Sequence, residues 1–333
     1  MKNSTINTGK ICRLMAIALL LVSGCNKDKL PTADKNITNG ITAVVSNNAS
    51  SLSLFGYALT ATHYNDTLSK PGPFTVLCPS NTAFINAGYA SGVDIIKATG
   101  LMNTLLPYYV FRKELKFNSL PLAFDQPVTA SNGQTIYITR WQNSRDTAII
   151  ANGIRLSTFD KPAANGLVNI TDGMLTPPVY KNVQEAVSGD PSLSFFNAAL
   201  IRSGLAETLK TGGPYTIFAP VNNAFSSIGL LSVDDVYKAD PAFLQALVKG
   251  HVVTKRSFVY DYILKADVTT NTYEETMLND AKSTITLIPD NTVQGRFLGI
   301  RIKGSSPNTA TLPKINVLSG NGVVHSITNI LTQ

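Results

Sequence analysis

The sequence predicts an α+β fold made of two tandem copies of one module, and three observations support this. Segment 51–55 (SLSLF) recurs as 192–196 (SLSFF), and 72–84 (GPFTVLCPSNTAF) recurs as 213–225 (GPYTIFAPVNNAF), both at an offset of 141 residues. Within each copy, helical patterns come first and strand patterns follow, which is typical of an α+β domain and not of a doubly wound one. The length of 333 residues also suits two domains of ordinary size.

The ends of the two copies match as well. Segment 165–175 (NGLVNITDGML) corresponds to 321–331 (NGVVHSITNIL), at an offset of 156 residues. The second copy should therefore carry about 15 extra residues between its first and last motifs. We expect them to extend the β region around 290–313.

Each copy should open with helices that have one apolar face. The apolar residues at helical spacing are Ile41, Val44, Val45, Leu52, Phe55 and Leu59 in the first copy, and Val183, Val187, Phe196 and Leu200 in the second. Short strands should follow at 74–77 and 215–219, each stopped by a proline. Asn81 and Asn222 come directly afterwards, and we expect these asparagines to cap the next short helix.

Later segments carry further start and turn signals. Asp240-Pro241 predicts a helix start, and Ser232 with Asp235 resembles a capping box with Asp in place of Glu. Segments 135–139 (TIYIT) and 283–287 (STITL) alternate as strands do. The Asn-Gly pairs at 132–133, 152–153 and 321–322 should supply the positive φ angles of turns.

The N-terminus predicts export. Three basic residues, Lys2, Lys10 and Arg13, precede an apolar run at 14–22 that is too short to be a permanent membrane span. Residues 22–25 (VSGC) resemble the lipobox of bacterial lipoproteins, in which the cysteine is acylated after cleavage. The resemblance implies a signal peptide at 1–24 and a lipid on Cys25 that anchors the chain to a membrane. Asn26 and the charged residues after it are similar to outer-membrane and surface lipoproteins of Bacteroidetes, so we expect a periplasmic or surface-exposed position on the outer membrane.

The domain limits follow from these features. Residues 25–36 should form a polar tether, 37–178 the first domain and 179–333 the second, with the boundary at Pro177-Pro178. Without the basic residues of the leader, 25 basic and 21 acidic side chains leave a charge of +4, with no basic cluster. We therefore expect no nucleic-acid partner. Cys78 would be the single free cysteine of the mature chain, inside an apolar strand.

The repeated motifs resemble those of a known family. Segments 75–84 and 216–225 are similar to the first signature of fasciclin domains, Thr-Val-Phe-Ala-Pro-Thr-Asn-x-Ala-Phe. Segments 165–175 and 321–331 are similar to the closing signature, Asn-Gly-Val-Val-His-Val-Ile-Asp-x-Val-Leu. The resemblance covers about 300 of the 333 residues. It implies two tandem fasciclin-like domains, each a small β-wedge with packed helices, used in surface-anchored adhesion proteins without a cofactor.

Departures from the family pattern mark the candidate binding residues. The family's Tyr-His pair is split between Tyr108-Tyr109 in the first copy and His251 in the second, and only the second copy has the closing histidine, His325. The two histidines could form a metal or proton site, or make structural hydrogen bonds. We favour the structural role and expect no metal, because no set of ligands completes the pair. Trp141 could stack on a sugar or be partly buried.

Catalytic motifs are missing from the sequence. It contains no Gly-x-Ser-x-Gly, Walker, Gly-x-Gly-x-x-Gly or His-Glu-x-x-His motif. Adjacent carboxylates at 234–235 and 274–275 point apart on a helix or a strand, so we expect solvated or capping roles for them. We therefore expect no catalytic residues and no enzyme activity.

Three functions remain to be compared. The first is a non-catalytic adhesion or ligand-binding lipoprotein that holds matrix, protein or polysaccharide. The second is a structural or accessory component of an outer-membrane polysaccharide-uptake system. The third is an uncharacterised hydrolase. Transfer of function from fold is by analogy, so binding and turnover assays are needed to separate the three.

Overall fold

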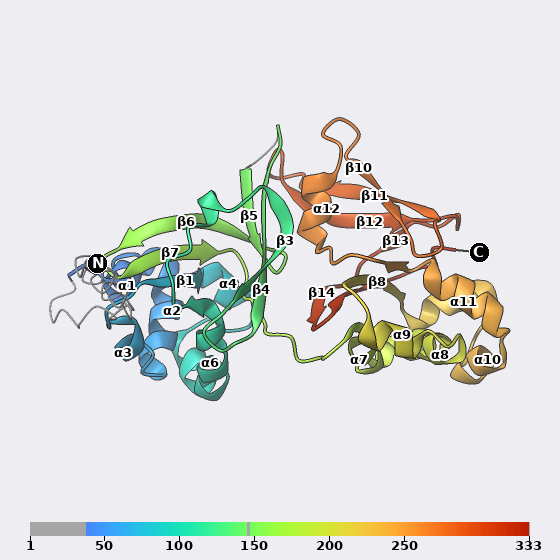
Figure 1. Cartoon of the computed structure of the whole chain (residues 1–333), viewed down its shortest axis with the longest axis horizontal. Coiled ribbons are helices and arrows are strands. Elements are labelled where there is room, and N and C mark those ends of the chain that lie inside the picture. The colour runs from blue at the N-terminus through green and yellow to red at the C-terminus, as the bar shows by residue number, and fades with distance from the viewer. Residues whose placement is uncertain (1–37, 145–146, 333) are drawn as a thin grey trace, which may run out of the picture.

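The computed structural model describes residues 38–144 and 147–332. The expected signal peptide 1–24 and tether 25–36, which include Cys25, lie outside the described residues. Figure 1 shows two lobes joined by the segment between β7 and α7, with α1–α6 below the sheet of the first lobe and α7–α11 below the sheets of the second, where α12 lies beside the upper sheet. Within the described ranges, no helix is both long enough and apolar enough to cross a bilayer.

The first half of domain 1 is helical, with one strand inserted. Its elements are α1 (Ile41–Asn47), α2 (Ala49–Ala61), α3 (Asn65–Leu68), β1 (Phe74–Pro79), α4 (Asn81–Asn86), α5 (Gly92–Lys97), α6 (Thr99–Leu105) and the 3₁₀ turn η1 (Leu106–Tyr109). The predicted apolar face of the opening helices is confirmed, because Leu52, Phe55 and Leu59 of α2 are buried. Strand β1 is buried along its whole length and ends at the expected proline.

The second half of domain 1 is β. It holds β2 (Val110–Phe111), the turn η2 (Phe117–Ser119), β3 (Ala123–Thr129), β4 (Thr135–Gln142), β5 (Thr147–Ala151), β6 (Ile154–Ala163) and β7 (Gly166–Thr171). These strands and β1 form one sheet in the order β2-β1-β7-β6-β5-β4-β3. The predicted alternation in β4 is confirmed, since Ile136 and Ile138 both point into the core.

Domain 2 repeats this plan. Its elements are α7 (Val183–Ser188), η3 (Pro191–Leu193), α8 (Ser194–Arg202), α9 (Ala206–Thr211), β8 (Tyr215–Pro220), η4 (Asn222–Ile228), α10 (Val233–Lys238), α11 (Pro241–Lys249), β9 (Val252–Val253), α12 (Val259–Lys265), β10 (Thr272–Thr276), β11 (Lys282–Pro289), β12 (Phe297–Lys303), β13 (Ala310–Thr311), β14 (Lys314–Ser319) and β15 (Gly322–Ile327). The strands divide into two four-stranded sheets, β14-β15-β8-β9 and β10-β11-β12-β13. The extra residues are only partly where we expected them. Strands β12 and β13 lie in the region 290–313, but α12 and the segment after it are also longer than the turn η2 and its following segment in domain 1.

The signature strands lie side by side in each copy. Strand β1 pairs in parallel with β7, and β8 pairs in parallel with β15. Thr75 lies opposite Leu167 in the first pair, and Thr216 lies opposite Val323 in the second. The first and last motifs of the module are therefore hydrogen-bonded neighbours at its centre, which confirms the α+β fold and the tandem duplication.

The predicted start signals are confirmed, and one turn prediction is wrong. Asp240 accepts hydrogen bonds from the first turn of α11, and Ser232 forms a capping box with Asp235. Gly133 and the pair Asn152-Gly153 have positive φ, as expected. The pair at 321–322 does not have positive φ, because Gly322 begins β15 in extended form, where an added Cβ would lie 2.3 Å from the Tyr215 carbonyl oxygen.

Candidate functional site

Two asparagines, one in each copy, fasten the start of the module to its end. The Asn165 Oδ1 accepts from the Ile41 N–H at 2.9 Å, and its Nδ2 donates to the carbonyls of Leu68 and Lys70 at 2.7 and 2.8 Å. Asn321 makes the equivalent set, accepting from the Val183 N–H and donating to the carbonyls at 209 and 212. These Asn-Gly motifs therefore act as internal ties.

The asparagines after the signature prolines also tie helices together, which corrects their predicted role. Asn81 Oδ1 accepts from the Leu54 N–H of α2, and Asn222 Oδ1 accepts from the Phe195 N–H of α8. The cap of α4 is made by the Ser80 hydroxyl instead. Each asparagine is the first residue of its own helix, α4 or η4. Its side chain therefore reaches the earlier helix, α2 or α8, and does not cap its own N-terminus.

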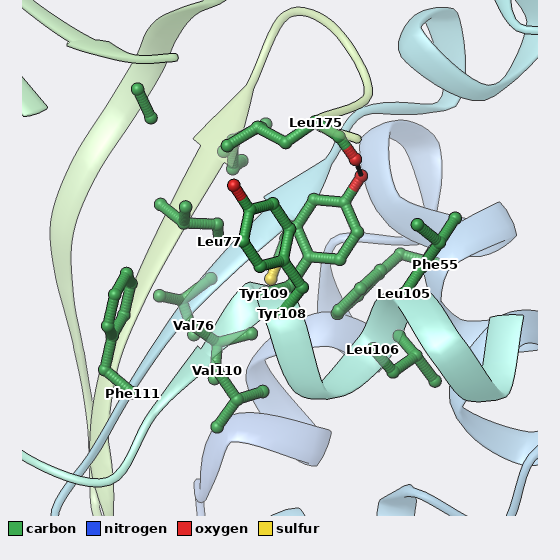
Figure 2. Close-up of a cluster of buried hydrophobic side chains, with 14 of the residues drawn as sticks. Phe55, Val76, Leu77, Leu105, Leu106, Tyr108, Tyr109, Val110, Phe111 and Leu175 are labelled. Atoms are coloured by element: carbon green, nitrogen blue, oxygen red, sulfur yellow. Dashed lines mark hydrogen bonds between the residues drawn. The ribbon is translucent and has the colours of Figure 1, made fainter. Parts of the chain in front are cut away.

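Tyr109 and His251 bind the backbone of the equivalent leucine in the two copies. The Tyr109 hydroxyl donates to the Leu175 carbonyl at 2.7 Å, as the dashed line in Figure 2 shows. In the second copy, Nε2 of His251 accepts from the N–H of Leu331 at 2.9 Å, and its Nδ1 donates to the Leu247 carbonyl. Both side chains therefore anchor the closing leucine of their domain, by opposite hydrogen-bond polarity.

His325 and Asn169 are a second equivalent pair. Nδ1 of His325 accepts from the Asn316 N–H at 3.1 Å, and Nε2 donates to the Ser257 carbonyl. In the first copy, Asn169 Oδ1 accepts from the Asp160 N–H at 2.7 Å. Asp160 and Asn316 both have a positive φ at an irregular point of their strand, at 55° and 57°. The closing histidine thus supplies an acceptor that an asparagine supplies equally well.

Burial keeps both histidines neutral. His251 and His325 are 0% exposed. Desolvation disfavours the imidazolium and lowers the pKa of each ring to about 4. Each ring uses one nitrogen as an acceptor, so protonation would also break a hydrogen bond.

The structure separates the five candidate binding residues into two kinds. Tyr108, Tyr109, His251 and His325 are essentially unexposed, and Figure 2 shows both tyrosines inside the core of domain 1. Their predicted contact with a ligand stays a prediction, and it would require the core to open. Trp141 is half-buried, and its ring lies 4.6 Å from that of Phe124 at the junction between the domains.

The other chemical candidates have structural surroundings. Cys78 is buried, and burial raises the pKa of its thiol. Glu275 was expected to be solvated, but it is buried and forms an ion pair with Lys255 at 2.9 Å. Among residues 38–144 and 147–332, no three His, Cys, Asp or Glu side chains group as metal ligands.

The domains meet where α12 packs against the β3–β4–β5 edge of domain 1, as seen at the centre of Figure 1. Asp261 of α12 is fully buried, and its Oδ1 accepts from the Thr139 hydroxyl of β4 at 2.9 Å. The Asn143 side chain donates to the Leu264 carbonyl at 3.0 Å. In the first copy the segment equivalent to α12 is only the short turn η2, so this docking helix belongs to the second domain.

An ion pair between the two domains lies on the other side of the junction. Nη1 of Arg256 lies 3.0 Å from Oδ2 of Asp125, and the guanidinium stacks 3.7 Å from the Tyr137 ring centroid. Burial outweighs the attraction of Arg256 and raises the pKa of Asp125 to about 6. Burial likewise raises the pKa of Asp261. The junction therefore combines apolar contacts, such as those of Ile150 with Leu264 and of Tyr137 with Phe258, with two buried carboxylates. Ionisation of these carboxylates makes the docking less favourable.

Beside this junction lies a cleft of about 480 Å³ with one wall from each domain. The domain 1 wall is the β5–β6 turn and the end of β7, and the domain 2 wall is α12 and the β11–β12 loop. Nη1 of Arg155 donates across the cleft to the Tyr260 hydroxyl at 2.9 Å. Arg296 is paired with Asp290, whose pKa the Thr292 hydroxyl and the Arg296 guanidinium hold at about 2.

The sequence patterns did not predict the junction between the domains or the cleft beside it. Asp261 does carry one signal, since it is the one carboxylate of a mainly apolar helix (VYDYILK). Its partner Thr139 is 122 residues away, and no local pattern links the two.

Comparison with known proteins identifies the module. The family model described as the fasciclin domain matches residues 50–177 and 191–333. The chain belongs to the fasciclin domain family. Human periostin is 24% identical over 280 residues, which cover 81% of this chain and 30% of periostin. The transforming growth factor-beta-induced protein ig-h3 of Sus scrofa is 27% identical over 270 residues, covering 79% of this chain and 35% of that protein.

Other fasciclin proteins match over different lengths. Stabilin-2 of Mus musculus is 26% identical over 206 residues, covering 57% of this chain and 8% of stabilin-2. A solved FAS1 domain pair from the insect cell adhesion molecule fasciclin I has a TM-score of 0.40 and 17% identity, with 86% of this chain and 98% of that chain covered. The chain spans about a third or less of the length of these curated relatives.

Proposed function

We propose that this fasciclin protein is a non-catalytic adhesion or ligand-binding module, held on the outer membrane by a lipid on Cys25. One observation carries the proposal: the buried polar motif residues of both copies bind their own backbone. Asn165, Asn321, Tyr109 and His251 all bind main-chain groups inside the module. The family motifs thus build a rigid frame, and contact with a partner is left to the outer surface.

Two further features support this function. Fasciclin membership associates the chain with adhesion, since a fasciclin I domain pair is described as part of a cell adhesion molecule. Two linked modules also allow weak contacts to add, provided that both engage the partner at once. The membrane anchor is supported by the lipobox-like residues 22–25.

The anchor and the adhesion can be tested in one experiment. Cells carrying the full chain are compared with cells carrying Cys25→Ala, with membrane fractionation and adhesion to immobilised matrix proteins and glycans as readouts. We expect Cys25→Ala to move the protein to the soluble fraction and to abolish cell adhesion, while the released protein still binds the same surface. Ser23→Ala, which keeps a small residue before the cysteine, serves as the matched control.

The outcomes separate the three functions. Unchanged membrane recovery of Cys25→Ala would refute the lipid anchor. If no surface binds either form, the adhesion function is wrong and a structural or accessory role in the envelope takes its place. Turnover of a glycan in the same assay, lost on changing one carboxylate, would establish a hydrolase instead.

A further inference from the structure

The interdomain cleft has the dimensions and surroundings of a ligand site. Its volume of about 480 Å³ lies within the roughly 300–1,000 Å³ of small-molecule pockets. Pockets of this kind occur preferentially where two domains meet. The cleft is separate from the buried motif residues, so a ligand there would leave the fasciclin core undisturbed.

The charges around the cleft balance internally. The described charged residues that line it are Arg155, Arg296 and Asp172, and Arg296 is paired with Asp290. Counted with Asp290, the described residues at the cleft are two cations and two carboxylates. Arg155 is further engaged with the Tyr260 hydroxyl. A ligand with a large net charge of either sign would gain no surplus of opposite charge here.

The lining alternates flat polar groups with apolar surface. Gln294 offers a planar donor and acceptor and Asp172 offers acceptors, while Asn143, Arg155 and Arg296 line the cleft with planar groups that already bind protein partners. The rings of Tyr260 and Phe297, with Ile154, offer apolar faces between them. A sugar ring carries the complementary surface, with C–H groups over its faces and hydroxyls around its rim. Each hydroxyl is both donor and acceptor, so it can pair with an amide or a guanidinium.

Glycines widen the cleft and expose backbone to the ligand. Gly173 and Gly295 both line it, and nothing lies within 4 Å of a Cβ built on Gly295. At Gly153, by contrast, an added Cβ would lie 2.8 Å from Phe258 of the other domain, and at Gly173 it would lie 3.1 Å from Ile154. The two walls are therefore close together at Gly153, and the space beside Gly295 is open.

We propose that the cleft binds a neutral oligosaccharide of a few sugar rings, gripped by both domains at once. This inference rests on the ligand-binding function proposed above. A ligand that touches Arg155 on one wall and Gln294 on the other would also fix the angle between the domains. Binding and domain docking would then strengthen each other.

The test uses the full mature chain carrying Cys25→Ala, titrated by calorimetry with neutral glucan, xylan and mannan oligosaccharides. Acidic pectin oligosaccharides and matrix peptides are included for comparison. Gln294→Ala removes a polar group of the cleft, and Phe297→Ala removes an apolar face. Gln245→Ala and Phe243→Ala are matched controls, because both residues are exposed on α11, outside the residues that line the cleft.

We expect a neutral oligosaccharide to bind, Gln294→Ala to weaken it roughly two- to tenfold, and the controls to leave it unchanged. Phe297→Ala should weaken binding roughly tenfold. Since Phe297 is half-buried, its fold is checked by circular dichroism, and Gln294→Ala keeps the test decisive if Phe297→Ala misfolds. Oligosaccharide binding with equal affinity in all cleft variants would overturn the cleft as the site and leave the binding function standing.

Binding of acidic glycans or peptides alone would overturn the neutral-saccharide assignment, again without harm to the binding function. If no glycan, peptide or matrix surface binds in either experiment, both proposals are overturned together.

Discussion

Replacing His325 by asparagine should remove half of the acid sensitivity that the two buried histidines give to domain 2. The pKa of His251 and of His325 is about 4 in the folded protein, against an ordinary value of 6.5. Since the folded-state pKa is the lower one, the stabilisation is complete above about pH 6.5 and is lost as the pH falls toward about 4. Between about pH 8 and about pH 4.5, each histidine should cost the domain about 2.5 kcal/mol of unfolding free energy.

The first copy shows that asparagine fits this position. Asn169 accepts from the Asp160 N–H as His325 accepts from the Asn316 N–H, and its Nδ2 donates to the Val76 carbonyl. His325→Asn should therefore lower stability at about pH 8 by no more than about 1 kcal/mol, the worth of one hydrogen bond. Because the amide does not titrate, the loss between about pH 8 and about pH 4.5 should shrink by about 2.5 kcal/mol.

The assay is urea unfolding at the two pH values. Trp141 fluorescence follows domain 1, which holds the single tryptophan of the chain, and circular dichroism follows both domains. The reciprocal variant Asn169→His is the control, and it should make domain 1 acid-sensitive. An unchanged pH dependence in His325→Asn would refute the assignment of acid sensitivity to this ring. Unfolding of the variant at about pH 8 would refute the equivalence of the two positions.

Two further predictions concern the ties and the junction. Asn165→Ala removes three hydrogen bonds, two of them buried and one partly buried, and should lower the unfolding free energy of domain 1 by about 3 kcal/mol. A loss below about 1 kcal/mol in urea unfolding would contradict the role of this residue as a tie. The pKa of Asp125 is raised to about 6 from 3.8, so docking of the domains should be strongest below about pH 4 and weaken as the pH rises through about 6. Energy transfer between dyes on the two domains measures this. Asp125→Asn should reduce the change in that pH range and leave the part due to Asp261, whose pKa burial also raises; an undiminished change in the variant would exclude the Asp125 carboxylate as a source.

Local patterns predicted the elements well where a residue acts on its own neighbours. Ser232 with Asp235 and Asp240 with Pro241 start their helices as expected, because the cap and the groups that it satisfies are within a few residues. The Asn81 prediction failed for the opposite reason. Its amide has a partner in α2, 27 residues earlier, and helix propensity carries no information about that contact.

The same distinction applies to the candidate site. Tyr108, Tyr109 and the motif histidines could be singled out from the sequence, but exposure is not a property of a motif. Once β1 pairs with β7 in the first copy and β8 with β15 in the second, these side chains lie inside their module. The sequence could also not show that the turn equivalent to η2 lengthens into a docking helix, because α12 is useful only against a surface of the other domain.

The sequence by itself determined that one α+β module occurs twice, that it is a fasciclin domain, and where its helices and strands begin. These properties follow from residue spacing, sequence repetition and helix caps, which act over a few residues or recur at a fixed offset. Only the tertiary structure decided that the motif polar groups face inward, and that Thr139 meets Asp261 across the junction. It alone also placed Arg155 and Gln294 on facing walls of one cleft. Such contacts join residues more than a hundred positions apart, and they exist only once both domains have folded and docked.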